Sequence, residues 1–108
     1  MCEVFAREGA DVAFNYSSSD DLAAEVVRAV EGLGRRALAH KVSVVDRPGC
    51  NRMVREILEE FGQLDVLVNN AGIHWTKTIE EETVEGLRKI LDVNLVGTFL
   101  GIQAAIGP

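Results

Sequence analysis

Two amides and two small residues, Asn69, Asn70, Ala71 and Gly72, come directly after the apolar run at residues 64–68. A compact apolar run of this length is typical of a strand that is buried on both faces of a parallel sheet. Ligands lie at the carboxyl edge of such sheets, where an Asn can donate and accept hydrogen bonds and Ala or Gly lets a flat ligand approach the backbone. The segment therefore predicts a ligand-binding strand end, with amides that only cap the strand as the alternative.

Short apolar runs alternate along the chain with longer amphipathic runs, and this alternation predicts βα units. The chain opens in what reads as the tail of a helix, so we expect it to be part of a longer unit. No repeat or linker divides it, which predicts one domain over residues 1–108. The expected elements are a helix end at 3–8, strands at 11–16 and 36–44, a helix from Leu22 to Leu33, a helix from Asp46 to Gly62, the strand at 64–68 and a long helix from Thr83 to Ile106.

Composition and charge limit the classes of function. A chain of 108 residues with 47% apolar and 26% charged residues is typical of a globular domain, and its net charge of −6 argues against binding to nucleic acid. No apolar run approaches the roughly 20 residues of a membrane span, and the first residues lack the form of a signal peptide, so we expect no membrane partner and a cytoplasmic location. The two cysteines and two histidines lack ligand spacing, which predicts no metal site and no disulfide; these residues are Cys2, Cys50, His40 and His74.

The run at residues 64–72 resembles the fourth strand of short-chain dehydrogenases/reductases, and the resemblance covers the whole chain. Residues 9–12 look like the start of the family's second strand, residues 61–65 like the approach to its fourth strand, and residues 92–99 like the middle of its long helix. The order and spacing of these pieces match together. The resemblance implies an α/β fold, a partial Rossmann-like doubly wound parallel sheet with the family's strands two, three and four and their flanking helices.

The resemblance also implies roles for single residues. Asn69, Ala71 and Gly72 fall where the family lines the adenosine ribose of the cofactor and the neighbouring phosphate region. Asn94 matches the helix Asn of the family's catalytic tetrad, which helps to hold a water that connects to the catalytic lysine. An Asn within an apolar helical stripe must in any case find hydrogen-bond partners, so an Asn satisfied in the core or at the surface is the alternative.

The ends of the first two strands bear on the choice between NAD and NADP. Tyr16, with Ser17 beside it, stands where the NAD-preferring pattern has an acid, and no carboxylate comes before Asp20. A carboxylate at this position would bind the ribose hydroxyls of NAD and repel the 2′-phosphate of NADP. Because the carboxylate is absent, NADP is favoured over NAD, although no Arg is found there to bind the 2′-phosphate. Ser43, next to Val44 in the predicted cofactor site, replaces the Asp that holds the adenine in many members and can still form a hydrogen bond.

Two motifs of the family are absent from the 108 residues. The glycine-rich turn Thr-Gly-x-x-x-Gly-x-Gly is missing, and Gly32 and Gly34 read as the end of a helix. The catalytic Tyr-x-x-x-Lys is missing too, because Tyr16 is the only tyrosine and Ser-Ser-Ser-Asp follows it. The resemblance thus implies a fragment of an NAD(P)-dependent oxidoreductase that acts on a small alcohol or ketone, similar to sugar dehydrogenases or ketoacyl reductases, and that is inactive alone.

The missing first strand has a consequence for stability and assembly. In the order 3-2-1-4-5-6 it lies between the second and fourth strands, so we expect a sheet without its middle and a marginally stable chain. We also expect a homo-oligomer formed through the long C-terminal helix. One alternative is a non-catalytic module that associates with a full-length relative, and another is a flavodoxin-like receiver, which the absence of an acidic metal pocket disfavours.

Overall fold

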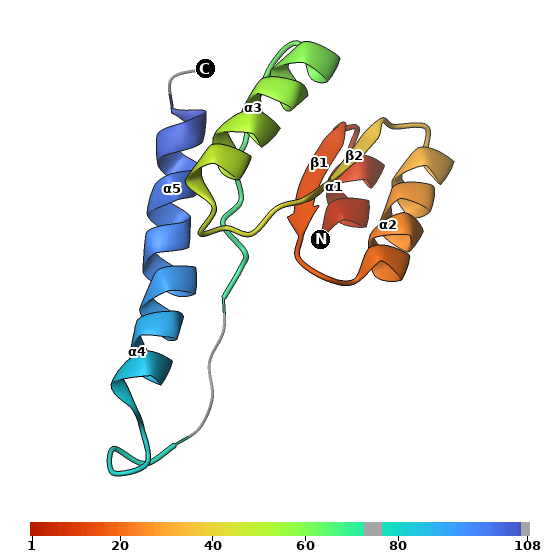
Figure 1. The fold of residues 1–108 in the computed structure, drawn as a ribbon. Helices are drawn as coiled ribbons and strands as arrows, with labels where there is room; N and C mark the ends of the chain where they lie inside the picture. Colours follow the sequence, from red (N-terminus) through yellow and green to blue (C-terminus); the bar gives the residue numbers. More distant parts are fainter. Residues whose placement is uncertain (73–76, 107–108) are drawn as a thin grey trace.

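The computed structural model describes residues 1–72 and 77–106 and contains a two-stranded parallel sheet with flanking helices (Figure 1). This arrangement confirms the α/β class. The helices and strands that were expected before residue 63 all form, within a few residues of their predicted bounds. In chain order the elements are α1 (Cys2–Arg7), β1 (Val12–Tyr16), α2 (Asp20–Gly32), β2 (Ala37–Lys41), α3 (Arg47–Phe61), α4 (Val84–Leu91), η1 (Asp92–Val96) and α5 (Gly97–Ala105).

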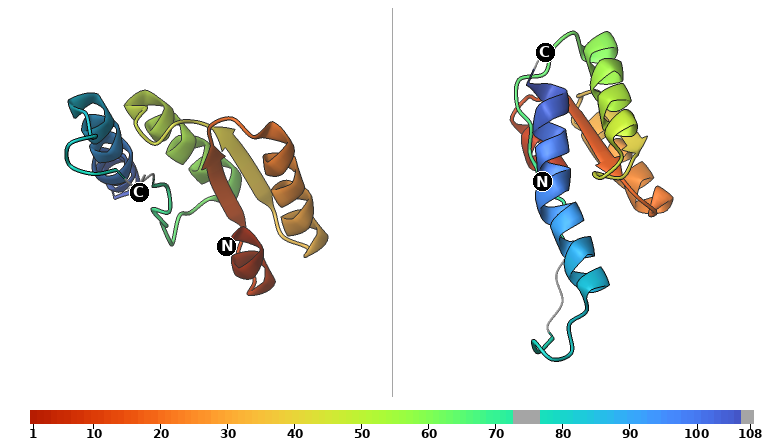
Figure 2. Two further views of the ribbon diagram at one scale, coloured as in Figure 1. Left: turned by 90° about the horizontal axis from the view of Figure 1, so that it is seen from below. Right: turned by 60° about the vertical axis from the view of Figure 1, so that its left-hand side comes forward.

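The N-terminal half forms one layer of helices against the sheet. β1 and β2 pair in parallel, with Val12 opposite Ala37 and Tyr16 opposite Lys41. The crossover helix α2 packs on β2, and α1 packs on α2 (Figures 1 and 2). In this layer the buried apolar side chains are Ala6, Ala23 and Val30.

Helix α3 begins and ends at the residues that the sequence marks. The side chain of Asp46 accepts a hydrogen bond from the backbone N–H of Gly49 at 3.1 Å, and Pro48 stands in the first turn, where no N–H is needed. Gly62 ends the helix with φ of 81°, in the left-handed region that favours glycine. Thr83 caps α4 in the same way as Asp46, because its hydroxyl oxygen accepts from the N–H of Gly86 at 3.0 Å.

The long C-terminal helix is continuous through α4, η1 and α5 but contains a π-helical turn. In η1 the N–H of Gly97 donates to the carbonyl oxygen of Asp92, five residues earlier, and the Thr98 hydroxyl donates to the Asn94 carbonyl oxygen at 3.0 Å. Single π-helical turns are rare and often lie at functional sites. Much of the apolar face of this helix remains exposed; examples are Leu87, Leu91, Leu95, Phe99 and Ile102.

The strand expected at residues 64–68 does not form. No backbone hydrogen bond joins residues 64–72 to another described residue, and Val66 and Val68 are 64% and 46% exposed. The prediction of a strand buried on both faces is therefore wrong. The physical reason is the absence of a neighbour: β1 pairs with β2, and the apolar run has no second backbone beside it with which to form a ladder.

Without a strand beside residues 64–68, the structure is less compact than a typical domain of its size. The radius of gyration is 15.5 Å, whereas a compact domain of this size has about 13 Å. Helices α3 and α5 pack on each other beside the sheet, with Ile57 and Leu100 buried between elements of that half (Figure 1). The two halves thus share little apolar core.

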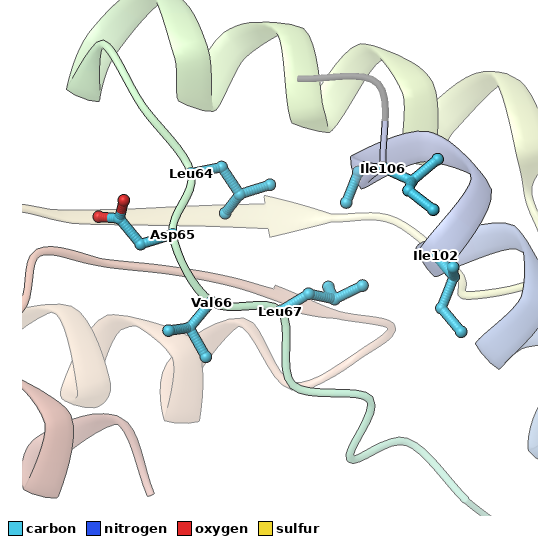
Figure 3. Close-up of a pocket in the computed structure, with 7 residues that line it drawn as sticks. Leu64, Asp65, Val66, Leu67, Ile102 and Ile106 are labelled. Carbon is cyan, nitrogen blue, oxygen red and sulfur yellow. The ribbon is translucent and has the colours of Figure 1, made fainter.

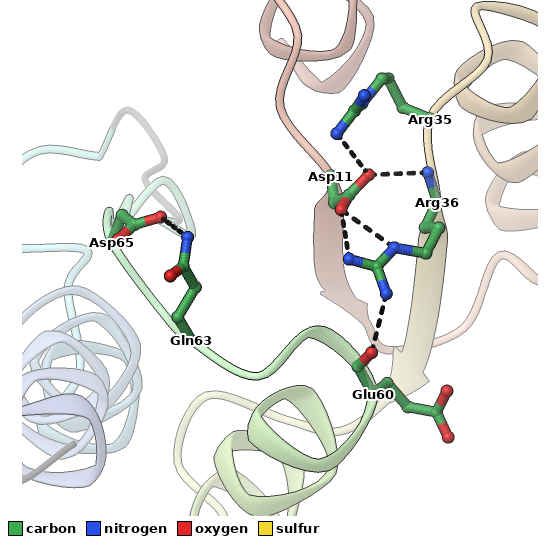
Figure 4. A network of polar contacts seen from close by, with 6 residues as sticks. All are labelled: Asp11, Arg35, Arg36, Glu60, Gln63 and Asp65. Carbon is green, nitrogen blue, oxygen red and sulfur yellow. Dashed lines mark hydrogen bonds and ion pairs between the residues drawn. The ribbon is translucent and has the colours of Figure 1, made fainter.

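A polar network connects the two halves (Figure 4). The Asp11 carboxylate, at the start of β1, accepts hydrogen bonds from the Arg36 backbone N–H, Nε and Nη2 at 3.0, 3.0 and 2.7 Å, and forms an ion pair with Arg35 at 3.1 Å. The other terminal nitrogen of Arg36 donates to the carbonyl oxygen of Glu60 at 2.9 Å, and its guanidinium lies 4.9 Å from the centre of the Phe61 ring. Arg36 thereby attaches the last turn of α3 to the start of the sheet.

Candidate functional site

Four of the predicted site residues come together along the long helix. A Cβ atom on Gly97 would lie 2.7 Å from Cγ2 of Val44, so the loop after β2 rests on the start of α5. A Cβ atom on Gly101 would lie 2.7 Å from Oδ1 of Asn69, one turn further along. Gly72 lies beside the preceding π-helical turn, where its Cβ position is 3.5 Å from Oδ1 of Asn94. The structure thus brings Val44, Asn69, Gly72 and Asn94 to one helix.

The side chains of this group are open to the surroundings. Asn69, Ala71 and Gly72 are exposed, and the segment that carries them is irregular rather than the end of a paired strand. Asn94 is also exposed, and its backbone carbonyl oxygen accepts from the Thr98 hydroxyl within the π-helical turn. An exposed amide next to two small residues can form hydrogen bonds to a ligand that approaches the backbone closely.

Ser43 stabilises its own turn. Its hydroxyl oxygen accepts from the backbone N–H of Val45 at 3.3 Å, and its carbonyl oxygen accepts from the backbone N–H of Asp46 at 3.0 Å. The Sγ atom of Cys50 lies 3.7 Å from the same carbonyl oxygen, and burial is the main reason that the pKa of this thiol is raised. The hydroxyl of Ser43 keeps its proton available for a ligand, since a hydroxyl can donate while it accepts.

The end of β1 carries more charge than the sequence indicated. Tyr16 is paired in register with Lys41, whose Nζ lies 3.4 Å from Oδ2 of Asp20. A hydrogen bond to the Asp20 carboxylate, together with desolvation and the charge of that carboxylate, raises the pKa of Tyr16. Ser17 is exposed beside them. Asp20 therefore brings a carboxylate to this strand end and Lys41 brings a cation, and only the parallel register reveals that these two residues are neighbours.

A shallow apolar hollow lies between the irregular segment and the end of α5 (Figure 3). Its volume is about 210 Å³, and Leu64 and Leu67 point toward Ile106 and Ile102 while Val66 points away. None of the predicted site residues lines it. The hollow offers no group for acid or base chemistry apart from Asp65.

The histidines, the cysteines and the helices give no further site in the described part of the chain. In residues 1–72 and 77–106 no group of three or more His, Cys, Asp or Glu side chains could hold a metal ion. His40 lies in β2 with Nε2 3.0 Å from Oε2 of Glu56, and His74 falls outside the described residues.

None of the described helices is both long and apolar enough to cross a membrane. The cytoplasmic location stays a prediction.

The family model described as short chain dehydrogenase matches residues 1–107. The chain belongs to this family. An uncharacterized oxidoreductase of Methylorubrum extorquens is 40% identical over 105 residues, which cover 97% of this chain and 42% of that protein. L-rhamnose 1-dehydrogenase (NAD(P)(+)) of a Sphingomonas species is 40% identical over 100 residues, covering 93% of this chain and 39% of that enzyme. The resemblance seen in the sequence is thereby confirmed.

A solved short-chain dehydrogenase extends the comparison to the fold. The enzyme from Burkholderia cenocepacia, in complex with NADP, matches with a TM-score of 0.91 and 37% identity over 97% of this chain and 43% of that one. The arrangement of the elements is thus that of a Rossmann-fold short-chain dehydrogenase. The chain spans about two fifths of the length of these relatives.

Proposed function

We propose that the chain is part of an NAD(P)-dependent oxidoreductase that transfers a hydride between the nicotinamide cofactor and a small alcohol or ketone. The observation that supports this most directly is the gathering of Val44, Asn69, Gly72 and Asn94 on one helix of a short-chain dehydrogenase. These residues come from three separate segments of the sequence and meet at the helix that carries Asn94. A sugar or a ketoacyl group is the kind of substrate we favour.

The residues present fit the adenosine half of a dinucleotide. Ser43 and Asn69 offer a hydroxyl and an amide, and Ala71 and Gly72 leave the backbone open to a flat group. When bound, the cofactor would supply or accept the hydride. In this proposal the chain's own residues hold the nucleotide, and Asn94 orients a water in the proton path. No Tyr-x-x-x-Lys stands within the 108 residues, so we infer that the chain alone does not catalyse the reaction.

We propose NADP as the preferred cofactor. Lys41 places a cation at the end of β1, and Tyr16 stands at the position where the NAD-preferring pattern has an acid. Asp20 neutralises part of the Lys41 charge, so the preference is expected to be modest. Substitution of Lys41 by Met should lower the preference for NADP over NAD.

A chimeric enzyme tests the proposal. Residues 1–107 would replace the matching region of the Sphingomonas L-rhamnose 1-dehydrogenase, which supplies the remaining parts of the fold. We expect a folded chimera with NAD(P)-dependent activity that Asn69→Ala weakens through the KM for the nucleotide and Asn94→Ala through kcat. A chimera that folds but binds neither nucleotide would overturn the proposed function.

A second candidate function is that of a module that associates through the long helix, either with a copy of itself or with a full-length relative. The apolar face of that helix supports it, because Leu95 and Phe99 are 64% and 55% exposed. Apolar patches of this kind mark protein contacts. Sedimentation analysis of the chain should show a dimer or larger species, and Phe99→Glu should reduce it to monomers. A monomeric chain that fails to co-purify with a full-length relative would contradict this candidate.

A further inference from the structure

Two glycines on one face of α5 each contact a predicted cofactor-binding residue from another segment. A Cβ atom on Gly97 would lie 2.7 Å from Cγ2 and 3.1 Å from Cβ of Val44, and a Cβ atom on Gly101 would lie 2.7 Å from Oδ1 of Asn69. Cβ atoms in proteins essentially never approach other atoms as closely as 2.7 Å. Any residue other than glycine at either position must therefore displace the side chain that faces it.

The backbone itself does not require glycine at these two positions. The described glycines with positive φ are Gly9, Gly34 and Gly62, whereas Gly97 and Gly101 have ordinary helical geometry. A glycine inside a helix destabilises it relative to alanine, so both positions weaken α5. The contacts with Val44 and Asn69 are the features of the described structure that account for them.

We propose that Gly97 and Gly101 are positioning residues for the nucleotide site, an inference that rests on the proposed function. By having no side chain, they allow the loop after β2 and the end of the irregular segment to lie directly against the helix. The same helix carries Asn94 in the turn that precedes Gly97. The two glycines thus fix the distance between the residues that would hold the adenosine and the residue that would serve the proton path.

Simple close packing of two helices is the competing explanation for glycines four residues apart. The nearest atoms that the two absent side chains would meet belong to Val44 and Asn69, which lie outside the helices. A packing role predicts that alanine at either position mainly disrupts the contact between α5 and α3. A positioning role predicts that alanine displaces one particular side chain, Val44 at position 97 and Asn69 at position 101.

Denaturation of the 108-residue chain separates these explanations. Gly97→Ala should lower the urea midpoint, with about a tenfold loss in the folding equilibrium constant, because both Cγ2 and Cβ of Val44 must move. Gly101→Ala should lower it less, because only the amide end of the exposed Asn69 side chain must move and alanine favours the helix. Gly32→Ala is the matched control, because it is helical and nothing lies within 4 Å of its Cβ position. The loss from Gly101→Ala should vanish in an Asn69→Ser background, and the loss from Gly97→Ala should largely vanish in a Val44→Ala background.

An NMR signal gives a readout that a general loss of packing would not move. The side-chain amide resonances of Asn69, assigned by their disappearance in Asn69→Ala, should shift in Gly101→Ala and remain in place in Gly97→Ala and Gly32→Ala. If these resonances do not move, or if the loss from Gly101→Ala persists in the Asn69→Ser background, the proposal is wrong.

Should the variant chain not fold, the same pairs of variants are compared in the chimera, where Gly101→Ala should raise the KM for the nucleotide about tenfold with kcat retained. The first two measurements use no cofactor, so a failure of the proposed function would leave their outcome intact.

Discussion

Oδ1 of Asn94 lies 3.5 Å from the position that a Cβ atom on Gly72 would occupy. The distance is an ordinary van der Waals contact, and it joins the π-helical turn of the long helix to the end of the irregular segment. The Asn94 side chain, which is proposed to serve the proton path, therefore lies next to the backbone of Gly72, which is proposed to line the cofactor site. A larger side chain at residue 72 should therefore displace the Asn94 side chain more than a smaller one does.

Gly72→Ala should be tolerated, because a single methyl group fits at this distance. Gly72 has no positive φ to lose, so we expect a change in stability within about 0.5 kcal/mol. Gly72→Leu needs room that the Asn94 side chain occupies and should displace it. Heteronuclear NMR of the Asn94 side-chain amide, with urea denaturation alongside, checks both variants. Equal displacement of Asn94 by alanine and leucine would refute the contact.

Gly49→Ala should destabilise the chain by about 1–3 kcal/mol. A Cβ atom there would overlap Oδ2 of Asp46 and lie 2.8 Å from Cγ1 of Val42, so the capping carboxylate must leave the N-terminus of α3. Urea denaturation followed by circular dichroism measures the loss. Asp46→Ala removes both the cap and the overlap, so alanine at residue 49 should cost clearly less in that background. A full cost in both backgrounds would show that the overlap with Asp46 is not the cause.

The parts of the fold that the sequence predicted correctly depend on local signals. The cap at Asp46, the glycine at Gly62 and the cap at Thr83 act within one helical turn, so their residue types were sufficient to predict the helix ends. The paired strands β1 and β2 are joined by a single crossover through α2, so each strand finds its partner nearby in the sequence. Each of these elements formed as expected.

The features that the sequence did not reveal depend on partners at a distance. The apolar run at residues 64–68 has the composition of a buried strand, but a strand exists only where a second backbone accepts its hydrogen bonds. The π-helical turn around Asn94 involves one extra residue per turn, which helical periodicity does not encode. The approach of Lys41 and Asp20 at the end of β1 follows from strand register, and residue types alone could not predict it.

Acid should weaken the attachment of α3 to the sheet through Asp11. Hydrogen bonds from the Arg36 backbone and side chain hold the pKa of Asp11 below its ordinary value of 3.8. A carboxyl group with a lowered folded pKa stabilises the fold above its unfolded pKa and loses that contribution as the pH falls through the folded pKa. The wild-type urea midpoint should therefore fall below about pH 4, and Asp11→Asn should lower the midpoint at neutral pH and flatten this part of the profile.

Arg36→Lys is the matched variant for this prediction. A lysine keeps the charge but cannot donate two parallel hydrogen bonds to Asp11 together with a third to the Glu60 carbonyl oxygen. It should lower the midpoint at neutral pH and reduce the acid dependence less than Asp11→Asn does. An Asp11→Asn chain with an unchanged midpoint and an unchanged acid profile would show that the network contributes nothing to stability.

The titration of Tyr16 reports directly on the end of β1, because it is the only tyrosine in the chain. The hydrogen bond to Asp20, desolvation and the Asp20 charge all raise the pKa of Tyr16 above its ordinary value of 10.0. The stability that this interaction contributes is present below the unfolded pKa and is lost as the pH rises through the folded pKa. The near-ultraviolet absorbance of the phenolate should show a midpoint above 10.0 in the wild type and a lower midpoint in Asp20→Asn. Asp21→Asn is the control, because it is a change of the same kind in the same helical turn, and it should leave the midpoint almost unchanged. If the two variants lower the midpoint equally, long-range charge and not contact with Asp20 raises the pKa of Tyr16.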